Sequence, residues 1–380
     1  MSLAERLKYG RERANLTGEK VQEKTGIGAS SLSEFENGKR EPKLSQLQNL
    51  ATLYHRSISF FLEEGPIPRE VVLWRERPDN AEDIEARFLR LCKQYKNLEE
   101  WCGERTESYL PEVSIPADEF NYPQAVELAG QARRNMELGD HPANELLCVL
   151  EEVHGIKVFH NDFNPTGPAA SAKSQSFGMA ILLNRANVRW RRNYDLAHEL
   201  FHLLTWDVFH NSGEESSAKA SEHEENLANK FAAHLLMPDE SVKSSLMRRA
   251  RNGRIRYEAL YDVAREFDVS IASLLWRMHW LKNRTPEEAE KTRCEIVEAE
   301  RLEKSLPDRN PGDNPPDLPE RYCSLAVQAL RQGEISIGRF AEYLGISRQK
   351  AMTYVEQETA NSETIPLLLS VDELIQIPLA

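Results

Sequence analysis

Two histidines four positions apart, His198 and His202, constrain this chain more than any other feature of its sequence. On a helix, residues at this spacing project from one face about one turn apart, and Glu199 lies beside them. This is the spacing at which two neutral imidazoles bind Zn²⁺ while the intervening glutamate serves as general base. A third protein ligand would come from elsewhere in the chain, and an open fourth position would carry a water whose pKa the metal lowers to about 7.

The alternative is that the two histidines lie on an ordinary helix, since short motifs arise by chance in a chain of 380 residues. The surrounding stretch counts against this alternative. Asn193 or Asp195 can cap the start of a helix. The apolar residues that supply its buried side are Leu196, Ala197, Leu200, Leu203 and Leu204. We therefore expect a helix over 193–204.

A second helix is expected between Glu222 and Pro238, where apolar residues recur at helical spacing. Glu225 lies three and seven positions before Ala228 and Ala232, so it shares their inward side. This position makes Glu225 the leading candidate for the third ligand. If the register of the helix differs, three neighbours are the alternatives: Glu222, His223 and Glu224.

Together the two stretches resemble the ImmA/IrrE-type metallopeptidases. The resemblance rests on Tyr-Asp-Leu-Ala-His-Glu-Leu-Phe-His at 194–202 and on Glu-x-x-Ala-Asn-x-Phe-Ala-x-x-Leu-Leu-Met-Pro at 225–238. In that family both histidines and the glutamate of the second helix bind zinc, and the glutamate between the histidines is the general base. The resemblance therefore implies Glu199 as the catalytic base and three zinc ligands: His198, His202 and Glu225.

The chain departs from the family pattern at two positions. Phe201 stands where the family usually has glycine, and Asp195 stands where it usually has threonine. Neither change removes a ligand. Phe201 is expected beside the substrate cleft, where its ring would narrow the cleft.

Length and charge limit the organisation and partners of the chain. At 380 residues it is long for one core, so two to four domains are expected. A net charge of −13 argues against nucleic acid covering the whole protein, so any DNA contact must be local. The five scattered cysteines form no C-x-x-C pair and indicate no disulfide framework. No apolar run reaches the ~20 residues that span a bilayer, so we expect a cytoplasmic protein with no membrane partner.

Residues 1–65 contain five short helical patterns joined by glycine-containing turns, which is typical of a helix-turn-helix domain. Within them, residues 25–42 resemble the turn and recognition helix of the XRE, or phage-repressor-like, family. The resemblance implies that the start of the third helix enters the major groove of DNA. The candidate DNA contacts are Ala29, Ser30, Ser31, Ser33, Lys39 and Arg40.

The charge of this domain supports DNA binding less strongly than its helical pattern does. Residues 1–65 carry ten Lys or Arg against nine Asp or Glu. The alternative is a fold retained for homodimer formation or for recognition of a partner protein. Phe60 and Phe61, at the end of the domain, would then be either core residues or a dimer contact.

The composition of residues 63–68 predicts a linker. The region 66–125 is expected to consist of linker and of an amphipathic helix over 81–101. This helix would pack against the peptidase core or a second subunit. The peptidase domain is expected over 126–285. Two helices are expected within 122–154, at the start of this domain.

Two short strands are expected in the peptidase domain, at 156–159 and 179–184. The Pro, Gly, Ala and Ser-rich stretch 164–175 between them looks like a mobile loop that would gate substrate. Next come a charged helix and flexible linker at 286–319, and a small helix-turn-helix-like module and tail at 320–380. The expected fold class is mainly α, of the α+β type with a small sheet.

Basic residues gather at two places outside the first domain. Four arginines precede the zinc helix: Arg185, Arg189, Arg191 and Arg192. They would bind nucleic acid or an acidic substrate segment, or would be solvated. The resemblance suggests a regulatory ligand here, single-stranded DNA being one candidate. A second arginine cluster at 248–256 is expected at the surface.

These features predict a zinc endopeptidase fused to a DNA-binding transcriptional regulator domain. Its substrate would be a repressor protein in a stress-response or mobile-element and defence context. One alternative is a regulator or antitoxin whose zinc fold senses a ligand or partner without proteolysis. Another is a peptidase whose first domain recognises the protein substrate and contacts no DNA.

Overall fold

The protein is described here from a computed structural model that covers residues 2–14, 16–54, 56, 58–62, 70–104, 110–163, 169–210, 220–282, 288–303 and 314–353. The linker expected at 63–68, residues 307–313 of the expected second linker and the apolar tail at 365–379 lie outside these residues. The chain divides into two compact units. One holds residues 1–96 and 105–319, and the other holds 97–104 and 320–380. Helices with one small sheet make up the described residues, so the expected fold class is confirmed.

The first domain has the five helices that the sequence predicts. They are α1 (Leu3–Arg13), α2 (Gly18–Thr25), α3 (Ala29–Glu36), α4 (Leu44–Leu53) and α5 (Ile58–Leu62). Their apolar sides form a separate small core that includes both Phe60 and Phe61. Between α2 and α3, Gly26 has a φ of 71°, a left-handed conformation that glycine adopts without steric cost. The helix-turn-helix geometry thus depends on this glycine.

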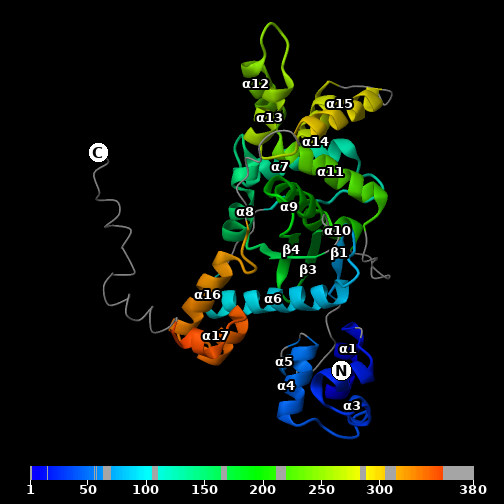
Figure 1. Cartoon of the computed structure of the whole chain (residues 1–380), viewed down its shortest axis with the longest axis vertical. Helices are drawn as coiled ribbons and strands as arrows, with labels where there is room; N and C mark the ends of the chain where they lie inside the picture. Colours follow the sequence, from blue (N-terminus) through cyan, green and yellow to red (C-terminus); the bar gives the residue numbers. More distant parts are fainter. Residues whose placement is uncertain are drawn as a thin grey trace, which may run out of the picture. The chain divides into compact units, whose positions relative to one another are not determined.

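A four-stranded sheet lies at the centre of the larger unit (Figure 1). The strands are β1 (Val72–Trp74), β2 (Lys157–Asn161), β3 (Ala169–Ser174) and β4 (Gly178–Asn184), in the order β1-β3-β4-β2. β3 is antiparallel to both β1 and β4, whereas β2 is parallel to β4.

The sheet corrects the expectation of a mobile loop at 164–175. Where this stretch is described, residues 169–174 form β3. This strand pairs with a neighbour on each side, and most of its small side chains are buried. Alanine, serine and lysine carry little strand propensity by themselves, so the local sequence favoured a loop. Pairing with β1 and β4 makes the strand. β1 was not predicted either.

Helices cover both faces of the sheet. On one face, α9 (Arg189–Leu204) packs on β3 and β4. On the other, α6 (Ala81–Trp101) presses Phe88 and Tyr95 edge-on against Phe159 of β2. Figure 1 shows the sheet between these two helices. The predicted role of α6 in packing against the peptidase core is therefore confirmed.

The helical segment before β2 differs from the sequence prediction. α7 (Tyr122–Asn135) is regular, but the second helix expected within 122–154 consists of a 3₁₀ turn (Pro142–Asn144), a short α8 (Leu146–Cys148) and a π turn (Val149–Val153). The segment ends at Gly155, whose φ is 62°. Hydrophobic periodicity reports a buried helical face and does not distinguish these changes of pitch.

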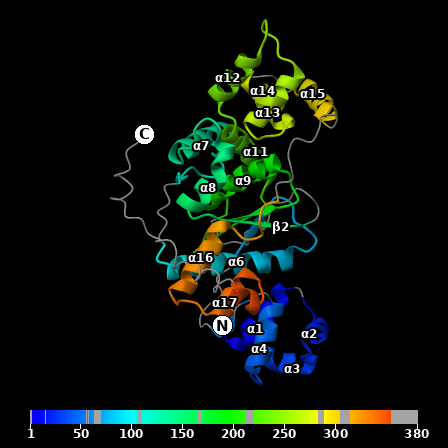
Figure 2. The same cartoon turned by 60° about the vertical axis from the view of Figure 1, so that its left-hand side comes forward.

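Behind α9, α11 (Glu222–Leu236) packs against both α7 and α9. The remaining helices of this unit are α10 (Trp206–Phe209), α12 (Asp239–Arg249), α13 (Tyr257–Glu266), α14 (Ile271–Leu281) and α15 (Glu288–Glu303). Figure 2 shows α12 to α15 gathered beyond α11. Arg277 of α14 ties this group to the end of α11 by donating to the Met237 carbonyl at 2.9 Å.

The smaller unit contains α16 (Glu320–Arg331) and α17 (Ile337–Leu344) together with the last turn of α6. Arg321 donates to Glu99 at 2.7 Å in a buried ion pair, and Trp101 stacks on Tyr343. Among the residues described, no helix combines the length and apolar character needed to cross a membrane.

Candidate metal centre

Helix α9 carries both histidines of the motif into the interior. His198 and Glu199 have no exposed surface and His202 has 1%. The helix begins at Arg189, one turn before the expected start, so Asn193 and Asp195 do not cap it. Asn193 instead donates to Asp268, and Asp195 is buried as an acceptor within the fold.

Helix α11 brings Glu225 to the two histidines. Its start is fixed by Ser221, whose hydroxyl accepts the backbone N–H of Glu224. One Glu225 oxygen lies 3.1 Å from His198 Nε2 and the other lies 3.7 Å from His202 Nε2. The two Nε2 atoms are 3.2 Å apart. The two ring nitrogens and the Glu225 carboxylate, which are three potential ligand groups, therefore converge on one point.

The opposite nitrogens of the two rings determine which atoms face this point. His198 Nδ1 lies 3.2 Å from Asn229 Oδ1, and His202 Nδ1 lies 2.8 Å from Glu224 Oε1. Because both of these partners are acceptors, each Nδ1 carries a proton and donates it. In the neutral form of either ring, Nε2 then presents a lone pair. Burial opposes protonation of His202, but the hydrogen bond to Glu224 and the nearby carboxylates raise its pKa. Burial lowers the pKa of His198 to about 4, which keeps that ring neutral.

This arrangement fits Zn²⁺. Two lone pairs and a carboxylate facing one another in a buried site repel unless a cation lies between them. Zinc bonds to nitrogen and oxygen of roughly 2.0–2.2 Å place tetrahedral ligand atoms roughly 3.3 Å apart. The observed separations of 3.1, 3.2 and 3.7 Å bracket that value. The residues named by the sequence are thus the ones the fold brings together.

The other candidate ligands on α11 face elsewhere. Glu224 contacts His202 through Nδ1 and also lies 2.9 Å from His210 Nε2. His223 lies 3.0 Å from the Phe120 carbonyl, and Glu222 is exposed. Among the described residues in this first turn of α11, only Glu225 faces both Nε2 atoms.

Glu199 is held as a buried carboxylate beside the histidines. Neither of its oxygens has a hydrogen-bond partner of ordinary geometry in the described part of the chain. Burial raises its pKa to about 7, against the opposing effects of His202 and the Ser171 hydroxyl of β3. A carboxylate with free lone pairs and a pKa near neutrality is suited to accept and return a proton.

Three residues of the site were not found by sequence reasoning. Asn229 contacts Nδ1 of His198, and His210 lies 2.9 Å from the Glu224 oxygen that contacts Nδ1 of His202. Arg75, just after β1, bonds Asp195 at 3.0 Å, and its positive charge lowers the pKa of Glu199 and Glu225. Asn229 lies one helical turn after Glu225, a spacing that could have identified it, whereas Arg75 follows a strand that is distant from α9 in the chain.

Phe201 corrects the expectation that its ring would narrow the cleft. The side chain is fully buried and packs against Phe120, Phe209 and Phe231 at centroid distances of 5.6 to 6.4 Å. It therefore belongs to the core under the metal centre. Tyr194 packs against the same core and donates to Asn229 at 3.2 Å.

The four arginines before and within the start of α9 are not a free basic surface. Arg185 pairs with Asp162 and Asp317, Arg189 with Asp268, Arg191 with Asp195, and Arg192 donates to the Asn187 carbonyl. Their charges are thus largely matched within the fold. In the second cluster, Arg248 and Arg249 pair with Glu266, whereas Arg251, Arg254 and Arg256 are exposed.

The candidate DNA contacts lie on or just after α3. Ser30, Ser33, Lys39 and Arg40 are exposed, and Ala29 and Ser31 are half-buried. The Ala29 N–H donates to Gln22 of α2 at 2.9 Å, which fixes the turn between the two helices. Arg40 already stacks on Phe35 and lies 3.5 Å from Glu34, so Lys39 is the freer cation of the pair.

Comparisons with known proteins agree with the description of the first domain and with that of the domain that contains the candidate metal centre. Residues 7–61 match the family model described as helix-turn-helix, and residues 151–279 match the peptidase family model described as IrrE N-terminal-like domain. A curated relative, the HTH-type transcriptional regulator ImmR of Bacillus subtilis (strain 168), is 34% identical over 70 residues. The match covers 18% of this chain and 55% of ImmR, so the chain spans about half the length of this relative.

Two solved structures align along most of the chain. Bacillus thuringiensis PlcR in complex with the peptide PapR7 and DNA is 14% identical, with 95% of this chain and 98% of that chain covered. ComR from Streptococcus suis is 12% identical, with 96% and 90% covered. Both TM-scores are 0.16, which is too low to support an argument. The family models show that this chain joins an XRE-type helix-turn-helix domain to a domain of the ImmA/IrrE peptidase type.

Proposed function

We propose that this protein is a zinc-dependent endopeptidase and DNA-binding transcriptional regulator that cleaves a repressor protein. The observation that carries the proposal is the convergence of His198, His202 and Glu225 beside the buried Glu199. In this proposal the first three residues are the zinc ligands and Glu199 is the catalytic residue. The peptidase family model over residues 151–279 supports the same assignment.

The reaction would use the residues of this site in fixed roles. Zn²⁺ held by the three ligands would polarise the scissile carbonyl and lower the pKa of the attacking water. Glu199 would accept the proton of that water and return it to the leaving amine. Asn229 and Glu224 would keep both imidazoles in the tautomer that directs Nε2 inward. Burial of the site strengthens each of these electrostatic interactions.

The regulatory part of the proposal rests on the first domain. ImmR is named as a transcriptional regulator, and its match supports DNA binding by residues 1–65. The proposal places this regulator in a stress-response or mobile-element and defence context. The exposed Ser30, Ser33 and Lys39 would contact DNA, together with Ala29, Ser31 and Arg40. The proposal also includes a homodimer and a regulatory ligand, for which single-stranded DNA is a candidate. A protein that binds DNA in this way would be cytoplasmic.

Metal content by mass spectrometry tests the ligand set. We expect about one zinc per chain in the wild type and loss of zinc in His198→Ala and in Glu225→Ala, because each removes one of three ligands. Glu222→Ala is the matched control, since it removes an exposed carboxylate from the same helical turn. A wild-type protein without metal, or Glu225→Ala with full zinc, would contradict the assignment.

Cleavage is tested separately, with a library of peptides derived from a bacterial proteome and mass spectrometry of the products. Wild type should cut a subset of these peptides, and Glu199→Gln should cut none while it keeps its zinc. The alternative function is a regulator or antitoxin whose zinc fold senses a ligand or partner, which the ImmR match also favours. Zinc retention without cleavage by the wild type would establish that alternative over the peptidase.

A further inference from the structure

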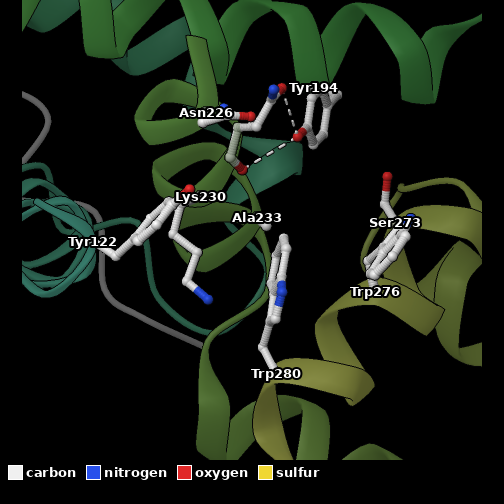
Figure 3. Close-up of a pocket in the computed structure, with 9 residues that line it drawn as sticks. Tyr122, Tyr194, Asn226, Lys230, Ala233, Ser273, Trp276 and Trp280 are labelled. Atoms are coloured by element: carbon white, nitrogen blue, oxygen red, sulfur yellow. Dashed lines mark hydrogen bonds between the residues drawn. The ribbon is translucent and has the colours of Figure 1, made fainter. Parts of the chain in front are cut away.

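A pocket of about 700 Å³ opens beside the candidate metal centre. One wall is the face of α11 that carries Asn226, Lys230 and Ala233, and the opposite wall is the face of α14 that carries Trp276 and Trp280 (Figure 3). This volume lies in the range of sites that enclose most of a small ligand or several side chains. No step of the proposed mechanism uses it.

Aromatic rings make up much of the pocket wall. Trp276 and Trp280 are stacked with their centroids 6.4 Å apart, and both are partly exposed. Tyr122, at the start of α7, is 49% exposed. Figure 3 shows Trp280 between Trp276 and the end of the Lys230 side chain. Such rings gain most when an apolar group covers them and excludes water.

Lys230 is the one charged residue among the described residues that line the pocket. Its ammonium lies 4.0 Å from the centre of the Trp280 ring, and the described structure gives it no hydrogen bond or ion pair. Burial lowers the pKa of Lys230 to about 8, so the lysine is largely protonated at neutral pH. Asp239 also attracts Lys230 but forms its ion pair with Arg277. A partly desolvated cation attracts an anion more strongly than a solvated one does.

Two of the residues that line the pocket belong to the hydrogen-bond network around His198. Asn229 Oδ1 accepts from His198 Nδ1, and Tyr194 donates to the same asparagine. Asn226, which also lines the pocket, directly follows the candidate ligand Glu225. Asn229 thus lies between the pocket and His198, and Asn226 is the chain neighbour of Glu225, so one residue separates the pocket from each of these two candidate ligands.

We propose that this pocket is a substrate subsite that selects a bulky apolar side chain, held by Trp276 and Trp280, next to an acidic residue paired with Lys230. The inference rests on the proposed peptidase function and specifies its substrate class. Asn226 and Ser273 supply the amide and hydroxyl groups that bind a peptide main chain. The substrate is thus a protein segment with adjacent hydrophobic and carboxylate side chains.

A peptide fits this pocket better than a nucleic acid does. Nucleic-acid affinity rises with the number of phosphates that lysines and arginines neutralise, and this pocket offers one cation. The net charge of the chain, −13, adds no general attraction for a polyanion. One carboxylate, in contrast, is fully matched by one lysine.

The test measures binding in full-length, zinc-loaded Glu199→Gln, so that cleavage does not interfere. Four end-capped octapeptides differ only at two central positions, which are Phe-Glu, Phe-Lys, Ser-Glu or Ser-Lys, and calorimetry gives each Kd. Phe-Glu should bind most tightly, with a loss of about 10- to 100-fold when Phe becomes Ser. Replacing Glu by Lys should cost about fivefold.

Second substitutions then assign each preference to a side chain. Lys230→Met should remove the preference for Glu and keep that for Phe, and Lys230→Arg should restore it. Trp276→Ala should reduce the preference for Phe. Lys243→Met, an exposed lysine of α12, is the matched control and should keep both preferences. Zinc content reports whether each variant is folded around the metal centre.

Two results would overturn the subsite. One is that Lys230→Met and Trp276→Ala leave both preferences unchanged. The other is that a single-stranded oligothymidylate binds more tightly than the Phe-Glu peptide and does so through Lys230. Failure of the peptidase proposal is distinguishable from these results, because it is read from cleavage by the wild type and not from binding by Glu199→Gln.

Discussion

Replacement of Glu224 should weaken zinc binding although this carboxylate does not face the three converging ligand atoms. It accepts from His202 Nδ1 at 2.8 Å and from His210 Nε2 at 2.9 Å, and it is 2% exposed. Burial alone would raise the pKa of Glu224, but the hydrogen bonds with the two histidines lower it to about 2. The group is therefore an ionised carboxylate that makes the His202 ring more basic and fixes its orientation.

The size of the effect follows from what each substitution leaves behind. Loss of an outer partner of a metal-bound histidine typically lowers metal affinity about 10- to 100-fold, or about 1.4–2.7 kcal/mol. Glu224→Gln keeps an acceptor for Nδ1 but removes the charge, so we expect about a tenfold loss. Glu224→Ala removes both and leaves His202 free to rotate, so we expect about a hundredfold loss.

The assay is competition for Zn²⁺ against a chromophoric chelator at fixed pH. Glu222→Gln is the control, because it removes one negative charge from the same turn of α11 without touching either histidine. Thermal unfolding of the metal-free variants separates a change in affinity from a loss of folded protein. An affinity of Glu224→Ala within twofold of wild type would refute the assigned role of this hydrogen bond.

Three further predictions concern other parts of the molecule. Phe201→Ala should lower the free energy of unfolding by about 3–5 kcal/mol in urea titrations, because it empties a fully buried site; a loss below about 1 kcal/mol would show that the ring is not a core residue. Lys39→Met should reduce by about one the slope of log affinity against log salt for a DNA duplex, and Arg40→Met should change it less, since Arg40 is engaged with its own helix; equal slopes would contradict this ranking. Because Lys230 has a pKa of about 8 and pairs with a carboxylate when protonated, affinity for the Phe-Glu peptide should fall as pH rises above about 8, and a flat profile would exclude the ion pair.

Local patterns were sufficient to predict the elements that carry the ligands. The four-residue spacing of His198 and His202 holds on any α-helix, and the fold places both on the buried face of α9. The amphipathic helix over 81–101 has the predicted bounds, because its apolar stripe continues for six turns without interruption. The turn of the first domain was also predictable, from the glycine at position 26. Glycine adopts the left-handed conformation found there without steric cost, so the signal lies in the residue itself.

The sheet shows where such patterns stop being informative. β3 is built largely of alanine and serine, and its strand conformation comes from hydrogen bonds to β1 and β4. β1 is three residues long and lies about one hundred residues before its partner in the chain. Pairing over such a separation is determined by the whole fold, so no window of sequence around either strand contains it.

The sequence by itself determined which residues bear the chemistry: two histidines, a glutamate between them and a carboxylate one helix later. Only the tertiary structure decided how these residues are held. It assigned Glu225 and Glu224 to opposite nitrogens of His202 and brought Arg75 to Asp195 from the edge of the sheet. It also turned the Phe201 ring into the core. Ligand identity follows from side-chain chemistry at short range, whereas orientation and charge environment depend on contacts between segments that are distant along the chain.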